Sequence, residues 1–258
     1  MKIISLGLGV QSTAMYLMSS LGEIDRADYA IFADPGAELP DTYQLLKDLN
    51  IWKSNNNGIP IIKKTKSLYK DIIKGQNSTG QRWASIPAFG ESGGMIRRQC
   101  TAEYKIEVVV KAVRELHGLK KYGRMKPTEM WLGISLDEIQ RMKSSQLYNI
   151  KYIYPLIDRR ITRSDCYKCL EDNNFKNVQK SSCTFCPYHN NKQWKYIKEN
   201  YPKEWKKVLK VDQAIRDSSK RGLNDKLYLH QSRKPIDEAY LQEDQEDLFM
   251  CEEGYCGI

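Results

Sequence analysis

The sequence predicts an α/β protein built on a parallel sheet. A short apolar run at the amino terminus is followed by a glycine turn and then by a stretch with helical spacing of apolar residues. The same alternation of strand and helix repeats through the first half of the chain, which is typical of parallel sheets. With 258 residues, 41% of them hydrophobic, the chain can bury a sizeable core. A charged fraction of 28% is ordinary, so composition excludes disordered and collagen-like classes.

Each element follows from its local pattern. Residues 2–5 form an apolar strand, Gly7 and Gly9 interrupt it, and residues 12–21 place apolar side chains on one helical face. Asp41 is a good N-cap for the second helix. We expect further strands at residues 29–33, 59–62, 130–134 and 152–156, and further helices at residues 42–49, 68–73, 101–117, 162–173, 193–200 and 205–217.

Two features concern the organisation of the whole chain. Residues 75–94 are rich in Gly, Ser and Gln and predict a long loop, and the pattern changes near residue 175. We therefore expect a nucleotide-binding domain over residues 1–175 and a helical lobe over residues 176–258. The chain has 41 Lys and Arg against 32 Asp and Glu, a formal charge of +9, which favours polyanionic partners. It contains no apolar run of about 20 residues, so we expect a cytoplasmic protein that does not enter a membrane.

The turn Ser-Leu-Gly-Leu-Gly-Val-Gln-Ser-Thr, residues 5–13, lies where the first strand passes into the first helix. Backbone N–H groups at a helix start and the hydroxyls of Ser12 and Thr13 can bind phosphate. The spacing fits neither a Walker A loop nor a dinucleotide fingerprint. Asp34 and Gly36 follow the next strand, at the end of the sheet where ligands bind in such folds. The alternative is a pair of ordinary strand-to-helix turns.

Four stretches in order resemble the PP-loop superfamily, which has the adenine nucleotide alpha-hydrolase-like fold, and within it the PAPS reductase family. They are the turn at residues 5–13, Ala-Asp-Pro-Gly-Ala-Glu-Leu-Pro-Asp-Thr-Tyr at 33–43, Gly-Ile-Ser-Leu-Asp-Glu-Ile-Gln-Arg at 133–141, and Tyr-Pro-Leu-Ile-Asp at 154–158 followed by Thr-Arg-Ser-Asp at 162–165. The resemblance implies an open, mostly parallel twisted sheet with helices on both faces, plus a small helical C-terminal lobe. One departure is Gln11, which stands where the family usually has an acidic residue.

The same resemblance implies a site for an adenine nucleotide, either ATP with Mg or a sulfonucleotide such as PAPS or APS. It implies catalytic roles for Asp34, near the nucleoside, and for Arg141, which would meet phosphate or sulfate. The alternative for Asp137, Glu138 and Arg141 is a solvated helix start with a local ion pair. The residues implied to line the nucleotide are Ser5, Gly7, Gly9, Gln11, Ser12, Thr13, Asp34, Gly36 and Gly133.

Seven cysteines cluster late in the chain, a pattern more typical of metal or redox sites than of disulfides here. Cys183 and Cys186 form a Cys-x-x-Cys turn, which can hold a metal ion or a cluster. Cys100 precedes the helix expected at residues 101–117, where amide dipoles stabilise thiolate charge. Similarity to the APS reductases implies a 4Fe-4S cluster on these three cysteines. The fourth position would be taken by Cys251 or Cys256, or left open.

Other interpretations of the cysteines and histidines stay open. Zinc on Cys183, Cys186, His189 and one more thiolate is one rival, and thiols without any ligand are another. Cys166 and Cys169 share a helical face and are more typical of core packing, and lone histidines such as His230 are usually satisfied structural residues. Cys256 and Gly257 resemble the terminal Cys-Gly of sulfonucleotide reductases, which implies a catalytic nucleophile; a disordered tail or cluster ligation is the alternative.

The C-terminal lobe combines lysines with aromatic residues. Such a surface suits RNA or single-stranded DNA, so a tRNA or DNA substrate is one expectation. The alternative, which is more common in proteins, is a solvated lysine face with the tryptophans buried in the core. The residues are Lys192, Trp194, Lys195, Lys198, Lys203, Trp205, Lys206, Lys207 and Lys210.

Three functions are compatible with the sequence. The first is an ATP pyrophosphatase that adenylates a substrate and transfers sulfur through an iron–sulfur cluster, with a separate sulfur donor or reductant protein. The second is a sulfonucleotide reductase with Cys256 as its nucleophile. The third is a non-catalytic module that binds zinc and nucleic acid.

Overall fold

The computed structural model describes residues 1–77, 79–83, 86–120, 123–219 and 222–242. The chain divides into two compact units, each built from three chain segments. The first unit comprises residues 1–33, 41–65 and 106–181, and the second comprises residues 34–40, 66–105 and 182–258. The second unit therefore draws on two early segments as well as the C-terminal part of the chain, which differs from a single cut at residue 175.

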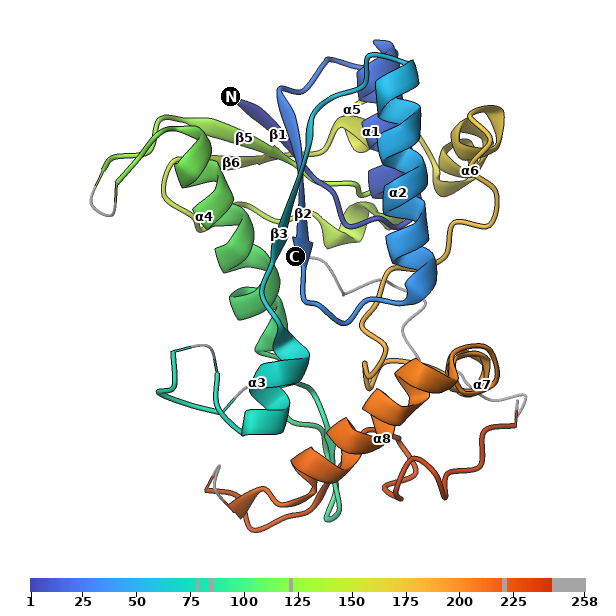
Figure 1. Ribbon diagram of the computed structural model, residues 1–258. Coiled ribbons are helices and arrows are strands. Elements are labelled where there is room, and N and C mark those ends of the chain that lie inside the picture. The colour runs from blue at the N-terminus through green and yellow to red at the C-terminus, as the bar shows by residue number, and fades with distance from the viewer. Residues whose placement is uncertain (78, 84–85, 121–122, 220–221, 243–258) are drawn as a thin grey trace. The chain divides into compact units, whose positions relative to one another are not determined.

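A five-stranded parallel sheet forms the centre of the first unit (Figure 1). Its strands are β1 (Lys2–Ser5), β2 (Tyr29–Asp34), β3 (Ile61–Thr65), β5 (Thr128–Trp131) and β6 (Ile150–Ile153). The strand order is β3-β2-β1-β5-β6, so β1 lies between β2 and β5. Helices flank this sheet, and the predicted α/β class is confirmed. The chain leaves β1 toward β2 and later returns to β5 on the other side of β1. This reversal makes the carboxyl ends of β1 and β5 the switch point of the sheet.

The helices of this part of the chain have their bounds set by capping and by apolar periodicity. They are α1 (Val10–Leu21), α2 (Pro40–Asn55), α4 (Glu107–Leu116), α5 (Pro155–Asp158) and α6 (Arg163–Asp172), with a 3₁₀ helix η2 (Leu136–Arg141) after β5. The π-helix η1 (Ala102–Ile106), which precedes α4, lies in the second unit except for its last residue. Helix α1 ends at Gly22, whose φ of 81° is a left-handed cap.

The first core lies between the sheet and helices α1, α2 and α6. Ile4, Leu17 and Leu170 are each at most 1% exposed, and the ring of Tyr16 meets that of Trp52 edge to face. Burying such side chains is the main favourable term in folding, at about 25 cal/mol per Å² of apolar surface. The first unit therefore has a core of its own.

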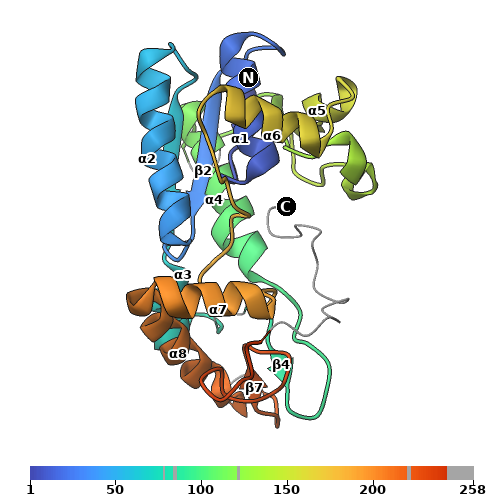
Figure 2. The ribbon, with the colours of Figure 1, turned by 90° about the vertical axis from the view of Figure 1, so that its right-hand side faces the viewer.

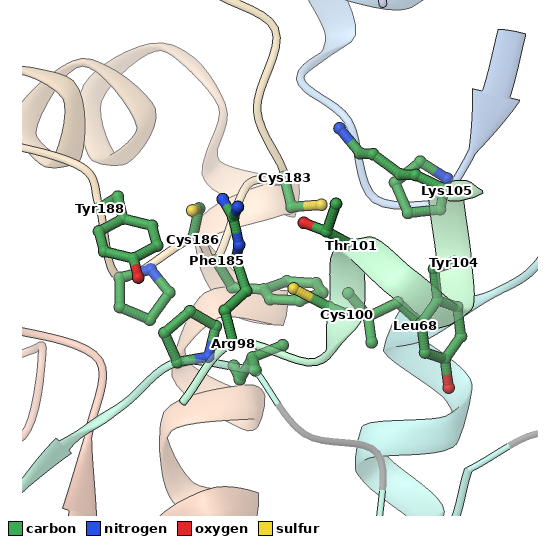
Figure 3. Close-up of a pocket in the computed structure, with 14 residues that line it drawn as sticks. Leu68, Arg98, Cys100, Thr101, Tyr104, Lys105, Cys183, Phe185, Cys186 and Tyr188 are labelled. Carbon is green, nitrogen blue, oxygen red and sulfur yellow. The ribbon is translucent and has the colours of Figure 1, made fainter. Parts of the chain in front are cut away.

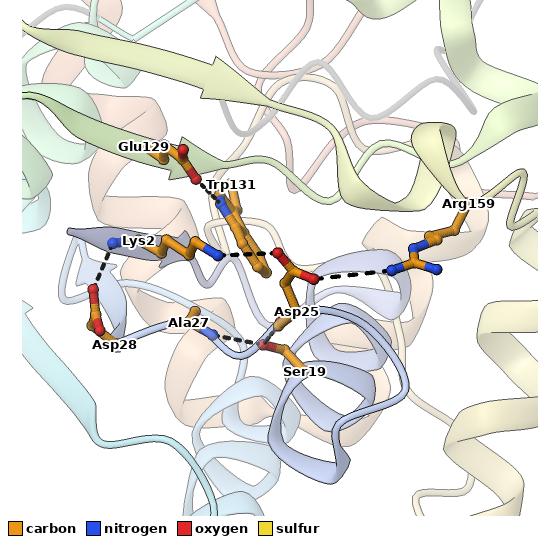
Figure 4. A network of polar contacts seen from close by, with 8 residues as sticks. All are labelled: Lys2, Ser19, Asp25, Ala27, Asp28, Glu129, Trp131 and Arg159. Carbon is orange, nitrogen blue, oxygen red and sulfur yellow. Dashed lines mark hydrogen bonds and ion pairs between the residues drawn. The ribbon is translucent and has the colours of Figure 1, made fainter.

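A polar network fixes the start of the central strand (Figure 4). The Lys2 ammonium lies 3.0 Å from Asp25 and 5.8 Å from the centroid of the Trp131 ring. The Lys2 backbone N–H donates to Asp28 over 2.7 Å, and Arg159 lies 3.9 Å from Asp25. These groups are largely exposed, so they define local geometry more than overall stability.

The second unit is helical, with a short antiparallel pair of strands from distant parts of the chain. Helices α3 (Leu68–Lys74), α7 (Asn191–Asn200) and α8 (Pro202–Arg216) enclose its core, and β4 (Phe89–Gly90) pairs antiparallel with β7 (Leu227–Tyr228) (Figure 2). Trp194, Phe185 and Val208 are fully buried here. Because the core combines early and late segments, neither segment buries its apolar face alone.

The expected elements are present with shifted bounds. The helix expected at residues 42–49 runs from Pro40 to Asn55, and the strand expected at 59–62 runs from Ile61 to Thr65. The N-cap prediction for Asp41 is wrong, because Pro40 occupies the first helical position and Asp41 lies within the first turn. None of the helices in the described residues has the length and apolar character needed to cross a lipid bilayer.

Candidate functional site

The turn between β1 and α1 has a constrained backbone. Leu8, between the two glycines, has a φ of 58°, a left-handed value that is rare for leucine, and its side chain is 1% exposed. Gly9 is the extended N-cap of α1, and the first helical bond runs from the Thr13 N–H to the Gly9 carbonyl over 3.0 Å. The backbone N–H groups of residues 10–12 lie before this first bond, so they have no acceptor within the helix. The first turn of α1 contains no acidic residue. This helix start can therefore accept an anion.

The sequence-predicted residues Ser12 and Thr13 lie in this first turn. The Gly9 N–H donates to the Ser12 hydroxyl over 3.2 Å, so Ser12 shapes the turn as well as lining it. The Thr13 hydroxyl is fully buried and has no hydrogen-bond partner among the described residues. Ser5 is the last residue of β1, directly before the turn.

A second loop approaches the same turn from β5. A Cβ atom on Gly133 would lie 2.7 Å from both the Cα and the N of Ser12, so only glycine fits there. The Gln11 amide donates to the Ser135 hydroxyl over 3.4 Å. The loops that follow β1 and β5 thus meet at the switch point, and the predicted residues Gln11, Ser12 and Gly133 come together.

Arg141 is held by carboxylate contacts at the end of η2. It pairs with Glu138, which is 7% exposed, and Arg163 lies 3.3 Å from the other carboxylate oxygen. Arg163 also donates its backbone N–H to Asp137 over 3.0 Å. The local ion pair is therefore present, with Glu138 buried between two guanidinium groups, and contact between Arg141 and a phosphate stays a prediction.

Asp34 and Gly36 belong to the second unit and form a tight turn. The Gly36 N–H donates to the Asp34 carboxylate over 2.7 Å, and Gly36 has a φ of 69°. The Asp34 carbonyl accepts from the Lys66 N–H over 3.0 Å. Asp34 is 2% exposed, so it shapes this turn; its proposed catalytic role stays a prediction.

Cys100, Cys183 and Cys186 line one pocket in the second unit, although 83 residues separate the first two (Figure 3). The pocket has a volume of about 480 Å³, including its part open to solvent. Its walls are mostly apolar and aromatic, with two cationic side chains. The other lining residues are Pro35, Leu68, Ile86, Pro87, Arg98, Thr101, Tyr104, Lys105, Phe185, Pro187 and Tyr188.

Backbone pairing positions the Cys-x-x-Cys turn. The Cys186 N–H donates to the Cys183 carbonyl over 3.0 Å, which closes the turn. Cys183 forms an isolated antiparallel bridge with Glu38, and the Thr184 N–H donates to the Ala37 carbonyl over 2.7 Å. The segment after Gly36 therefore holds the paired cysteines in place.

Cys100 reaches the pocket from the start of the helix that continues through η1. The π-helical residues following it include Tyr104, whose hydroxyl donates to Asp71 over 2.7 Å. Burial is the main cause that raises the pKa of Tyr104 well above its usual range, so this phenol stays protonated. π-Helical segments occur often at functional sites.

Two charged residues that the sequence interpretation did not assign lie at this pocket. Lys105 lines it and lies 3.4 Å from the buried carboxylate of Glu38, and Arg98 lines it two residues before Cys100. Figure 3 shows the Arg98 guanidinium directed into the space between the cysteines. Cationic groups favour anionic ligands and negatively charged thiolate complexes. Their closeness to Cys100 in the sequence was the signal that could have identified them.

His189 has the contacts of a structural residue. Its Nε2 lies 2.8 Å from the Cys183 carbonyl oxygen and its Nδ1 lies 3.3 Å from the Gln193 side chain. Its ring packs edge to face on Trp194, with 4.8 Å between centroids. Both ring nitrogens are engaged away from the thiols, which disfavours His189 as a zinc ligand. Within the described residues, no group of three or more His, Cys, Asp or Glu side chains could hold a metal ion. Cys251 and Cys256 lie outside the described residues.

Cys166 and Cys169 belong to the first core, as expected of a helical pair. They are 0% and 8% exposed, and burial raises the pKa of each thiol to about 12. His230 is also structural, with Nε2 at 2.9 Å from Asn191.

The tryptophans of the lysine-rich segment are buried in the second core, Trp194 at 0% and Trp205 at 8% exposure. Their rings are therefore not available to stack on bases, while most of the lysines are exposed.

Comparison with protein-family models found no match, and a search of curated proteins found no significant match.

Proposed function

We propose that this chain is a PP-loop ATP pyrophosphatase of the PAPS reductase type, which adenylates a substrate and transfers sulfur with the help of an iron–sulfur cluster. The observation that carries the proposal is the convergence of Cys100 with Cys183 and Cys186 on one pocket. The three thiols line one mostly apolar pocket with cationic residues nearby, and thiolates are the ligands of iron–sulfur clusters. In this structure the described side chains do not themselves form a ready metal site, so binding of the cluster would have to draw the three thiols together. The meeting of the two loops at Gly133 supports a nucleotide site in the first unit.

The turn of the first unit would bind the phosphates. The amides of residues 10–12 would donate to phosphate oxygens, and the Ser12 hydroxyl would add a further donor. A substrate oxygen would form a bond to the α-phosphorus of ATP as the bond to the leaving pyrophosphate breaks. The loop amides together with Mg would stabilise the charge on the departing group.

The pocket of the second unit would hold the cluster through Cys100, Cys183 and Cys186. When bound, such a cluster supplies an iron at which an extra sulfur can be held. The apolar wall, which includes Phe185 and Pro187, would limit access of water to the thiolates.

Metal analysis tests the cluster. We expect the anaerobically purified protein to contain iron and acid-labile sulfide. Cys183→Ala should lose both, while the matched variant Cys169→Ala, which changes a buried core thiol, should keep them. Stoichiometric zinc in place of iron, or full iron retention in Cys183→Ala, would contradict the assignment.

Nucleotide binding tests the turn. We expect Ser12→Ala to weaken Mg–ATP binding about 10- to 100-fold, because a hydrogen bond to a charged group contributes about 1.5–3 kcal/mol. Ser54→Ala, at an exposed position on α2, is the control and should bind normally. Titration calorimetry measures both. Equal Mg–ATP affinities of Ser12→Ala and the natural protein would show that the turn does not bind the nucleotide. Thioredoxin-dependent release of sulfite from PAPS would show that the protein is instead a sulfonucleotide reductase.

A further inference from the structure

Helices α7 and α8 carry two stripes of exposed lysines. Lys192, Lys195 and Lys198 recur every three residues on α7, and Lys203, Lys206 and Lys210 follow a similar spacing on α8. Among the residues that the structure describes, none of the six is ion-paired with a carboxylate; Lys198 instead lies 5.6 Å from the centroid of the Trp205 ring. Lys207, in contrast, pairs with Glu204 over 2.8 Å. The lysine stripes, as we call these six residues, are exposed positive charges on two helices that pack against each other.

The sequence contains a matching negative segment. Residues 243–258, called here the acidic tail, hold six carboxylate side chains and no lysine or arginine. Residues 1–242 hold 41 basic and 26 acidic side chains, a formal charge of +15, so the tail lowers the charge of the chain to +9. The acidic residues are Glu243, Asp244, Glu246, Asp247, Glu252 and Glu253.

The last described residue before this tail lies beside α7. Gln242, the last described residue, accepts a hydrogen bond from the Asn191 side chain over 3.0 Å. Asn191 is the first residue of α7 and is directly followed by Lys192. Leu241 packs against the second core, which secures this exit point.

The tail is long enough to reach both stripes. An extended chain spans up to about 3.3–3.6 Å per residue, so the 16 residues of the tail reach roughly 50 Å. The 15 residues of α8 span only about 22 Å. Tethering also gives the tail a high effective concentration at a surface beside its anchor, which strengthens weak ionic contacts.

We propose that the acidic tail docks on the lysine stripes of α7 and α8 and competes there with external polyanions. Complementary charge, the anchor at Asn191 and the length of the tail are the grounds for choosing this occupant. The tail thereby acts as an internal substitute for a polyanion. The inference is independent of the chemistry proposed for the pocket and the turn.

Carbodiimide crosslinking of the full chain tests the contact directly, since this reagent joins only carboxylates and amines that touch. We expect peptides that join tail carboxylates to lysines of α7 or α8. Crosslinks from the tail only to lysines elsewhere, or no tail crosslinks, would overturn the proposal.

Binding to heparin tests the competition. Replacing the six tail carboxylates by amides (E243Q, D244N, E246Q, D247N, E252Q and E253Q) should raise heparin affinity about tenfold at low salt, with the difference disappearing at high salt. Adding K192Q, K195Q and K198Q should abolish this gain. Adding K47Q, K111Q and K176Q, three exposed lysines of the first unit, should leave it in place.

That comparison separates docking from a general effect of net charge, because both triple variants remove the same charge. A gain that both triple variants reduce equally would contradict the proposal. So would full binding of single-stranded DNA at the lysine stripes irrespective of the state of the tail.

Discussion

Gly133 has no room for a side chain, since its Cβ would lie 2.7 Å from backbone atoms of Ser12. We expect Gly133→Ala to destabilise the protein by about 1–3 kcal/mol, the usual cost of overpacking. Gly9→Ala is the matched variant in the opposing turn, because the nearest atom to its Cβ is 3.9 Å away and its φ of −97° suits alanine. Urea denaturation of both variants measures the difference. A Gly133→Ala protein as stable as Gly9→Ala would show that the two loops are not in contact.

The buried thiols of Cys166 and Cys169 should resist alkylation. Burial raises the pKa of both to about 12, so at pH 8 almost no reactive thiolate is present. We expect mass spectrometry to find neither residue modified by iodoacetamide in the native protein at pH 8, and both modified in urea. Rapid native modification of either residue would contradict their placement in the first core.

Individual contacts at the candidate site could not be predicted from the sequence. The spacing of Cys183 and Cys186 predicted a shared turn, but the pairing of Cys183 with Glu38 depends on segments 145 residues apart. His189 has the spacing of a zinc ligand, and only three-dimensional packing shows its contacts with the Cys183 carbonyl and Gln193. Sequence patterns report residue type and periodicity, whereas these contacts depend on tertiary neighbours.

Helix α6 begins with a capping box that couples stability to pH. The Thr162 hydroxyl accepts from the Asp165 N–H over 3.2 Å, and the Asp165 carboxylate accepts from the Thr162 N–H over 2.8 Å. Hydrogen bonds from Thr162, first from its side chain, lower the pKa of Asp165 below the ordinary 3.8. A lowered carboxyl pKa gives stability that is present above the unfolded value and is lost as the pH falls through the folded value.

We therefore expect Thr162→Ala to destabilise the protein by about 1 kcal/mol at pH 7, the usual cost of losing an N-cap. The difference from the natural protein should shrink as the pH falls below the ordinary carboxyl pKa of 3.8 and through the lowered pKa of folded Asp165. Thermal unfolding of both proteins between pH 3 and pH 7 measures it. A constant difference across this range would mean that the Asp165 carboxylate does not contribute through the cap.

Most elements were predictable because their apolar residues recur with a clear period. The strand at residues 2–5 and the helix over residues 68–73 have bounds within one residue of β1 and α3. The two-residue strands β4 and β7 were not predicted, since they lie 137 residues apart and are too short to show alternation. The π-helical turn η1 was also missed, because it shares the side-chain pattern of the α-helix that it precedes.

Each of the two units combines segments from distant parts of the chain, so neither can fold from one continuous stretch. The second core combines Leu68, Ile72 and Tyr104 from one segment with residues of α7 and α8 from another. A fragment of residues 1–175 would expose the first group to water. We expect this fragment to aggregate and to bind a hydrophobic dye, in contrast to the full chain. Size-exclusion chromatography measures this, and a monodisperse, cooperatively folded fragment would contradict the division into two units.

Leu8 has a left-handed backbone conformation, which glycine adopts easily and leucine does not. Its side chain is buried, so packing of that side chain in the first core holds the turn in this conformation. Softening of the first core would release that restraint, and Leu8 could relax to an ordinary backbone conformation. If the turn binds phosphate as proposed, its affinity should therefore decline on warming before cooperative unfolding begins. Evolutionary changes in the core, far from any bound phosphate, would tune affinity by the same route.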